Sequence, residues 1–99
     1  MSRFTVYRNP SVRGYILNLQ ADIHGYFATR VVVPLLPVND IPDYAQTLNP
    51  IFEIEGEPMV MATQGMAAVP HALLKQPVMS LKSKQTEISV ALDLLFQGF

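Results

Sequence analysis

The chain has 99 residues, a net charge of −1 and no cysteine, so disulfide bonds, zinc–thiolate sites and thiol nucleophiles are excluded. Only 15% of its residues are charged, which leaves it without the positive field that sequence-independent binding to DNA or RNA requires. Hydrophobic residues make up 49% of the sequence, more than a domain of this length readily buries. We therefore expect one domain, residues 1–99, with apolar surface covered by a second copy of the chain.

The sequence predicts a cytoplasmic protein with no membrane association. Its first residues lack the apolar segment of a signal peptide. The longest apolar run, residues 31–38, is interrupted by Pro34 and Pro37, so it does not read as a transmembrane helix.

The first part of the chain predicts three strands. Residues 4–7 and 15–19 are rich in β-branched and aromatic residues, and the Asn, Pro and Gly of residues 8–14 suit a loop between them. We expect one face of the second strand to be buried and the face that carries Asn18 to be half buried. Residues 30–36 predict a third strand with an edge or a bulge at Pro34, because proline has no N–H for the ladder.

The second part predicts a hairpin, a further strand and a C-terminal helix. Residues 37–50 are rich in Pro, Asn and Asp and are expected to form a loop. Residues 51–54 and 59–63 predict two strands around a turn at residues 55–58. A short apolar run at residues 69–74 predicts another strand. Residues 81–96 predict a helix between a Ser80 cap and Gly98.

The predicted helix is apolar on two sides. One stripe consists of Ile88, Ala91, Leu92 and Leu95, and Val90, Leu94 and Phe96 lie off it. The only polar line runs through Ser89, Asp93 and Gln97. We expect the protein's own sheet to cover one side of this helix and a second protomer to cover the other.

No pattern of catalytic or metal-ligating residues stands out. His24 lies two residues from Asp22 and His71 follows Pro70, but neither has a second ligand at metal spacing, so no metal and no cofactor are expected. Asp22, His24, Arg13 and Arg30 together contain the groups of a ribonuclease site, although ordinary surface placement is the favoured interpretation. The methionines at 59, 61 and 66 are interpreted as core filling.

The charges are unevenly distributed along the chain. Bases near the start are Arg3, Arg8, Arg13 and Arg30, whereas the middle is acidic, with Asp40, Asp43, Glu53, Glu55 and Glu57. We interpret both groups as solvated surface, and the spacing of Glu53 and Glu55 as an exposed sheet face rather than a catalytic carboxylate pair.

Four ordered segments resemble motifs of the CcdB toxins of bacterial toxin–antitoxin pairs. They are Gln-Ala-Asp-Ile at residues 20–23, Arg-Val-Val-Val-Pro-Leu at 30–35, Met-Ala-Ala-Val-Pro at 66–70 and Leu-Leu-Phe-Gln-Gly-Phe at 94–99. The resemblance extends along nearly the whole chain. It implies a mainly β fold with a C-terminal α-helix: an SH3-like barrel of the CcdB/MazF kind, with an antiparallel sheet, a small second sheet and a homodimeric assembly.

The resemblance also implies a function without catalysis. Such a toxin binds the A subunit of DNA gyrase and traps the gyrase–DNA cleavage complex as a topoisomerase poison. It is neutralised by a CcdA-like antitoxin, contributes to plasmid maintenance and transcription autoregulation, and needs no cofactor. Two alternatives stay open on the same fold: an endoribonuclease of the MazF and PemK type, and a non-toxic relative that only binds antitoxin.

Carried over position by position, the resemblance assigns three sets of residues. The gyrase-contacting surface falls on Ile23, His24, Asp93, Phe96, Gln97, Gly98 and Phe99. The antitoxin-binding loop falls on Arg8, Asn9, Pro10, Ser11, Val12 and Arg13, and the dimer interface on Leu92, Leu95 and Phe99. Four positions of the gyrase surface depart from the family pattern. His24 replaces Ile, Asp93 replaces Asn, Phe99 replaces Ile, and Gln97 replaces the Trp that enters gyrase.

Overall fold

A computed structural model describes residues 3–11, 13–21 and 28–98 of the chain. The strands are β1 (Thr5–Arg8), β2 (Tyr15–Asn18), β3 (Thr29–Pro37), β4 (Ile51–Ile54), β5 (Glu57–Met61), β6 (Ala67–Pro70) and β7 (Pro77–Ser80). Four 3₁₀ turns, η1 (Val38–Asp40), η2 (Thr63–Gly65), η3 (His71–Leu73) and η4 (Lys82–Lys84), precede the helix α1 (Gln85–Gln97).

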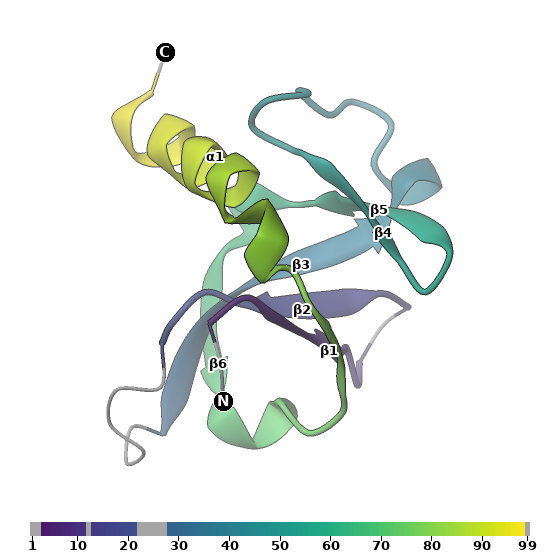
Figure 1. Cartoon of the computed structure of the whole chain (residues 1–99), viewed down its shortest axis with the longest axis vertical. Helices are drawn as coiled ribbons and strands as arrows, with labels where there is room; N and C mark the ends of the chain where they lie inside the picture. The colour runs from purple at the N-terminus through teal and green to yellow at the C-terminus, as the bar shows by residue number, and fades with distance from the viewer. Residues whose placement is uncertain (1–2, 12, 22–27, 99) are drawn as a thin grey trace.

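The strands form one antiparallel sheet in the order β4-β5-β3-β2-β1-β7, and β6 also pairs with β3. The sheet is curled, and α1 lies against one side of it (Figure 1). Buried side chains from both halves of the sheet and from α1 meet in one main core, to which Ile88 and Ala91 contribute from the helix. The predicted fold class, mainly β with a C-terminal helix in an SH3-like half-barrel, is confirmed.

Strand β3 explains how the sheet accommodates Pro34. One edge of β3 pairs with β2, and the other edge pairs with β6 over residues 29–32 and with β5 over residues 35–37. The Pro34 carbonyl accepts a hydrogen bond from the Ala62 N–H (2.9 Å). In an antiparallel ladder the N–H and C=O of one residue point to the same side. The nitrogen of Pro34 therefore faces the gap between β6 and β5, where no ladder hydrogen bond needs an N–H.

This arrangement changes two predictions about β3. It is a central strand with an uninterrupted register to β2, so the expected edge or bulge at Pro34 is replaced by a change of partner strand on the other side. Because β3 pairs with both β6 and β5, the strands that the resemblance assigns to a small second sheet are continuous with the rest.

Both faces of β2 are buried, so the prediction of a half-buried face is wrong. Leu17 lies in the main core. On the opposite face, Ile16 packs with Tyr7, Val32 and Leu74 in a second apolar cluster. The segment that follows η3 brings Leu74 to this face, a long-range contact that the alternation of residues in β2 does not reveal.

The β4–β5 hairpin closes with a two-residue turn at Glu55 and Gly56. Their φ angles are 52° and 83°, as a type I′ turn requires, and Ile54 pairs with Glu57 on either side. The second strand therefore begins at Glu57, earlier than predicted, and Pro58 lies within it. Glu55 belongs to the turn and not to the exposed face of β4.

The remaining differences concern β6, β7 and the start of the helix. The predicted strand at residues 69–74 is β6 at Ala67–Pro70 followed by η3, and β7 was not predicted. The helix α1 begins at Gln85 with Lys84 as its N-cap and no side-chain cap, so the predicted Ser80 cap is wrong. The Ser80 hydroxyl instead accepts a local hydrogen bond from the Lys82 N–H (3.1 Å). Gly98 ends α1 with φ 77°, as predicted.

Candidate functional site

The first candidate surface is the exposed side of the C-terminal half of α1. We call it the helix-end surface and define its described residues as Val90, Asp93, Phe96, Gln97 and Gly98, all exposed. The Phe96 side chain is 73% exposed and Val90 is 43% exposed. The C-terminal end of α1 extends past the strands in Figure 1, although Leu94 and Leu95 are partly buried.

The opposite side of α1 holds the helix on its own sheet. Ile88 and Ala91 are fully buried, and Leu92 is partly buried against the main core. Leu95 is also partly buried. Leu92 and Leu95, two predicted dimer-interface residues, therefore retain accessible surface at the border between the core and the helix-end surface. Coverage by a second protomer stays a prediction.

The end of α1 has a defined geometry. The Gly98 N–H donates to the Leu94 carbonyl (2.9 Å), and its φ of 77° is one that L side chains rarely adopt. No neighbouring atom lies within 4 Å of a Cβ built at Gly98, so this glycine is required by the backbone and not by crowding. Three predicted gyrase-contacting residues, Ile23, His24 and Phe99, lie outside the described residues.

The second candidate surface is the basic loop, defined as residues 8–13, of which Val12 lies outside the described residues. The Arg8 Nη2 atom lies 2.7 Å from the Glu55 carboxylate, and the Arg13 Nη2 atom lies 2.8 Å from the Glu57 carboxylate. Both partners belong to the β4–β5 hairpin. Two ion pairs thus join segments that are more than 40 residues apart in the sequence. We call this pair of contacts the Arg–Glu clasp.

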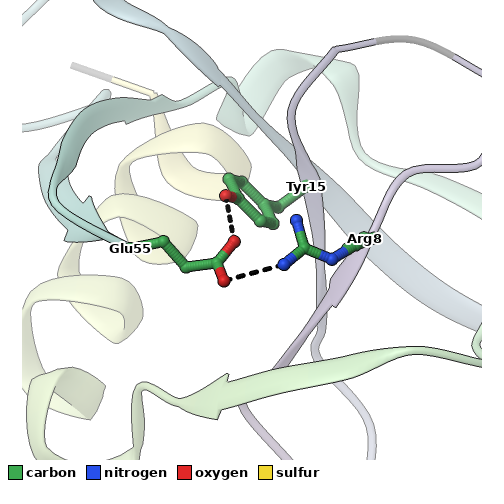
Figure 2. A network of polar contacts seen from close by, with 3 residues as sticks. All are labelled: Arg8, Tyr15 and Glu55. Carbon is green, nitrogen blue, oxygen red and sulfur yellow. Dashed lines mark hydrogen bonds and ion pairs between the residues drawn. The ribbon is translucent and has the colours of Figure 1, made fainter.

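Tyr15 completes the inner half of the clasp (Figure 2). Its hydroxyl donates a hydrogen bond to one Glu55 carboxylate oxygen (2.6 Å) while Arg8 binds the other. The Arg8 guanidinium carbon also lies 5.9 Å from the centre of the Tyr15 ring. Since the Tyr15 ring is buried in the main core, the inner half of the clasp has a fixed anchor.

The same contacts shift the pKa values of the three groups. The hydrogen bond from Tyr15, then the one from Arg8, lowers the pKa of Glu55 because both favour the carboxylate. The hydrogen bond to Glu55 raises the pKa of Tyr15 because the donor must keep its proton. The Glu55 carboxylate also raises the pKa of Arg8.

The basic loop is shaped by its own hydrogen bonds. The Asn9 N–H donates to the Gly14 carbonyl (3.2 Å), and the Ser11 N–H donates to the Asn9 side chain (3.0 Å). Gly14 has φ 130°, and a Cβ built on it would lie 2.6 Å from the Leu35 carbonyl oxygen, so only glycine fits there.

Two hollows flank the basic loop. One, of about 240 Å³, is lined by Arg8, Asn9, Pro10, Ala72, Leu73, Lys75 and Gln76. The other, of about 320 Å³, lies on the hairpin side and is lined by Arg8, Asn9, Arg13, Gly14, Tyr15, Glu57 and Met59. The predicted antitoxin residues Arg8, Asn9 and Arg13 therefore border concave surface, which suits contact with a partner.

The structure describes two of the four residues of the ribonuclease constellation, Arg13 and Arg30. Arg30 is buried in β3, whereas Arg13 is exposed and binds Glu57. Asp22 and His24 lie outside the described residues. His71 is exposed in η3. Within residues 3–11, 13–21 and 28–98, no group of three or more His, Asp or Glu side chains is placed to hold a metal ion.

Sequence reasoning missed Glu55, Glu57 and Tyr15 as partners of the basic loop. The signal that pointed to them is the separation of charge into a basic start and an acidic middle, which we interpreted as solvated surface. The structure shows that part of this charge is paired across the sheet. The interpretation of the methionines is confirmed, because Met59 and Met61 are buried and Met66 packs against the core.

The described residues form a small β protein with an exposed aromatic side chain at its helix end and a charged loop beside two hollows. No helix in the described part of the chain has the length and apolarity needed to cross a membrane. The family model for the CcdB protein matches residues 3–98. The chain therefore belongs to the CcdB family, the toxins of toxin–antitoxin pairs.

Proposed function

We propose that this CcdB-family toxin binds the A subunit of DNA gyrase through the helix-end surface and traps the enzyme on cleaved DNA. The observation that carries the proposal is the 73% exposure of Phe96 at the end of α1, beside exposed Asp93 and Gln97. Large exposed aromatic side chains are the usual anchors of protein interfaces. The toxin acts by binding, without catalysis or cofactor, and it acts in the cytoplasm, where gyrase meets the chromosome.

The assembly we propose is a homodimer, which presents the helix-end surface twice. Support comes from apolar side chains on two sides of α1 that keep accessible surface: Val90 is exposed on one side, and Leu92 and Leu95 are only partly buried on the other. A twofold pairing of these surfaces covers apolar area that the described chain leaves open. Phe99, the third predicted interface residue, follows directly after this region in the sequence.

A CcdA-like antitoxin is the proposed second partner, and the basic loop is its proposed site. Arg8 and Arg13 offer guanidinium groups suited to carboxylates, and the loop borders two hollows. This site is separate from the helix-end surface in its residues, so the two partner assignments are tested separately.

The gyrase assignment is tested by a pull-down of the pure protein with a gyrase A fragment, beside the variant Gln97→Trp. Because Trp is a larger anchor than Gln, worth about 2 kcal/mol in a packed site, the variant should bind roughly 30-fold more tightly. Phe96→Ala should weaken binding in both backgrounds. If neither the wild type nor Gln97→Trp binds, the gyrase assignment is wrong.

Expression in cells separates the alternatives. A gyrase poison should arrest growth and accumulate cleaved DNA bound to gyrase. Degraded messenger RNA with intact chromosomes would instead identify a MazF-type ribonuclease, and normal growth would identify a relative that only binds antitoxin.

A further inference from the structure

The Arg–Glu clasp is poorly explained as a device for stability. In the Arg8–Glu55 pair the side chains are 50% and 40% exposed, and in the Arg13–Glu57 pair they are 71% and 51% exposed. Ion pairs this exposed contribute little to folding, because water and salt screen them. Both pairs nevertheless have short, charge-assisted contacts. Their main effect is that the guanidinium groups of the two arginines of the basic loop are already bound by carboxylates of the same chain.

The backbone at Glu55 supports a role other than stability. Glu55 has φ 52° at the first position of a type I′ turn, where Asn or Gly adopts the required conformation with less strain. Glu at this position places its carboxylate within reach of both Arg8 and Tyr15. A conformationally unfavourable residue is thus present where its side chain contacts the basic loop.

We propose that the turn Glu55–Gly56–Glu57 is an internal acidic ligand of the basic loop, which an acidic segment of the antitoxin displaces. The turn itself indicates the chemistry of that segment: two carboxylates two residues apart bind Arg8 and Arg13. A partner with acids at positions i and i+2 presents the same pattern. The inference rests on the proposed antitoxin site, and it adds the chemical class of the segment and a step of exchange.

The two halves of the clasp differ in how readily they open. Arg13 and Glu57 form the more exposed pair, and no other interaction of theirs is present in the described part of the chain. Glu55 is held by Tyr15 as well as by Arg8. The exchange therefore begins at Arg13 and is completed at Arg8.

Internal competition has a measurable consequence. A partner binds only the fraction of molecules in which the clasp is open, so its apparent affinity is reduced by that fraction. Removal of the two carboxylates should free the arginines and tighten the binding of an acidic peptide, although the peptide gains no new contact. The effect should disappear at high salt, because the competing pairs are exposed.

The test uses the full chain and the probe acetyl-Thr-Val-Glu-Gly-Glu-Val-Thr-amide, with binding followed by NMR shifts of Gly14 and Ser11 at low ionic strength. We expect Glu55→Gln/Glu57→Gln to bind the probe at least fivefold more tightly than wild type, if the clasp is open in about one molecule in five or fewer. Arg8→Gln/Arg13→Gln should not bind it. A probe with Gln in place of both Glu residues should bind neither the wild type nor Glu55→Gln/Glu57→Gln.

The matched control is Glu53→Gln/Glu87→Gln, which removes the same charge from exposed positions outside the clasp. An equal gain in this control would show an effect of net charge and overturn the proposal, as would an unchanged affinity of Glu55→Gln/Glu57→Gln. A comparable gain for a short DNA duplex would assign the loop to phosphates and also overturn it. The gyrase pull-down does not involve this loop, so failure of the gyrase assignment is seen separately.

Discussion

At the scale of single residues, Glu55 links a turn conformation to a charge network. Its left-handed backbone places a carboxylate between a buried tyrosine and an exposed arginine. The sequence predicted the turn and showed the separation of charge, but it did not place residues 8 and 15 opposite that turn. That proximity comes from the curl of the sheet, which no local pattern encodes.

The Arg–Glu clasp predicts that stability depends on pH in both the acidic and the alkaline range. The folded pKa of Glu55 is lowered, so its contribution is present above the unfolded pKa and is lost as the pH falls through the folded pKa. The folded pKa of Tyr15 is raised, so its contribution is present below the unfolded pKa and is lost as the pH rises through the folded pKa.

We expect Tyr15→Phe to remove the alkaline effect and to weaken the acidic one, because Arg8 still binds the Glu55 carboxylate. The Glu55 carboxyl, followed by carbon NMR, should titrate at higher pH in this variant than in the wild type, because its first hydrogen-bond donor is gone. The Phe ring keeps the packing of Tyr15 in the core. An identical Glu55 titration in the two proteins would show that the hydroxyl does not stabilise the carboxylate in solution.

A second prediction concerns Gly14. Gly14→Ala should lower the free energy of unfolding by about 2 kcal/mol or more, because the new Cβ meets the Leu35 carbonyl at 2.6 Å and φ is 130°. Urea denaturation measures the loss. Gly65→Ala is the control, since its Cβ would meet the Pro34 side chain at 3.4 Å and the Ala62 Cβ at 4.0 Å, both ordinary contacts, and no positive φ is required. Equal stability of the two variants would contradict the close approach.

At the scale of elements, α1 divides into a side that folds the protein and a side that is free to bind. Ile88→Ala should cost about 2–5 kcal/mol of stability, because Ile88 is fully buried in the main core. Val90→Ala should change stability by only about 0.5 kcal/mol, because Val90 is exposed. Thermal unfolding of both variants, at a protein concentration low enough for single chains to predominate, checks this, and a large loss for Val90→Ala would mean that the chain itself covers this side of the helix.

The elements that the sequence predicted well have strong patterns of their own. The first hairpin, β3, the β4–β5 hairpin and α1 combine apolar periodicity with turn or cap residues. β7 was missed because Pro77, Met79 and Ser80 resemble a loop, and the strand exists only through its pairing with β1. β6 begins at two alanines, which are weak strand formers.

The candidate sites were predictable to different degrees. Phe96, Gln97 and Gly98 came from the resemblance, and all three are exposed. The basic loop was also assigned, but its pairing was not. A sequence shows which residues carry charge, whereas the partner of each charge depends on contacts more than 40 residues apart.

At the scale of the whole molecule, basic and acidic segments that are far apart in the sequence come into contact in the fold. Bases of the β1–β2 loop meet acids of the β4–β5 turn, although the two hairpins are not adjacent in the sheet order. The curl of the sheet, rather than strand pairing, brings them together (Figure 1). The curl of the sheet therefore places the carboxylates of the β4–β5 hairpin where they bind the arginines of the basic loop.

Because the aromatic ring of Phe96 is exposed, the stability of the native state depends on the concentration of any molecule that binds it. Any molecule that covers this ring binds the native chain and not the unfolded one, and at a free concentration 100 times its dissociation constant it adds about 2.7 kcal/mol to stability. The same holds for the partly buried Leu92 and Leu95 when an identical subunit covers them. The melting temperature then rises with the protein's own concentration, and dilution alone exposes the chain to unfolding and degradation.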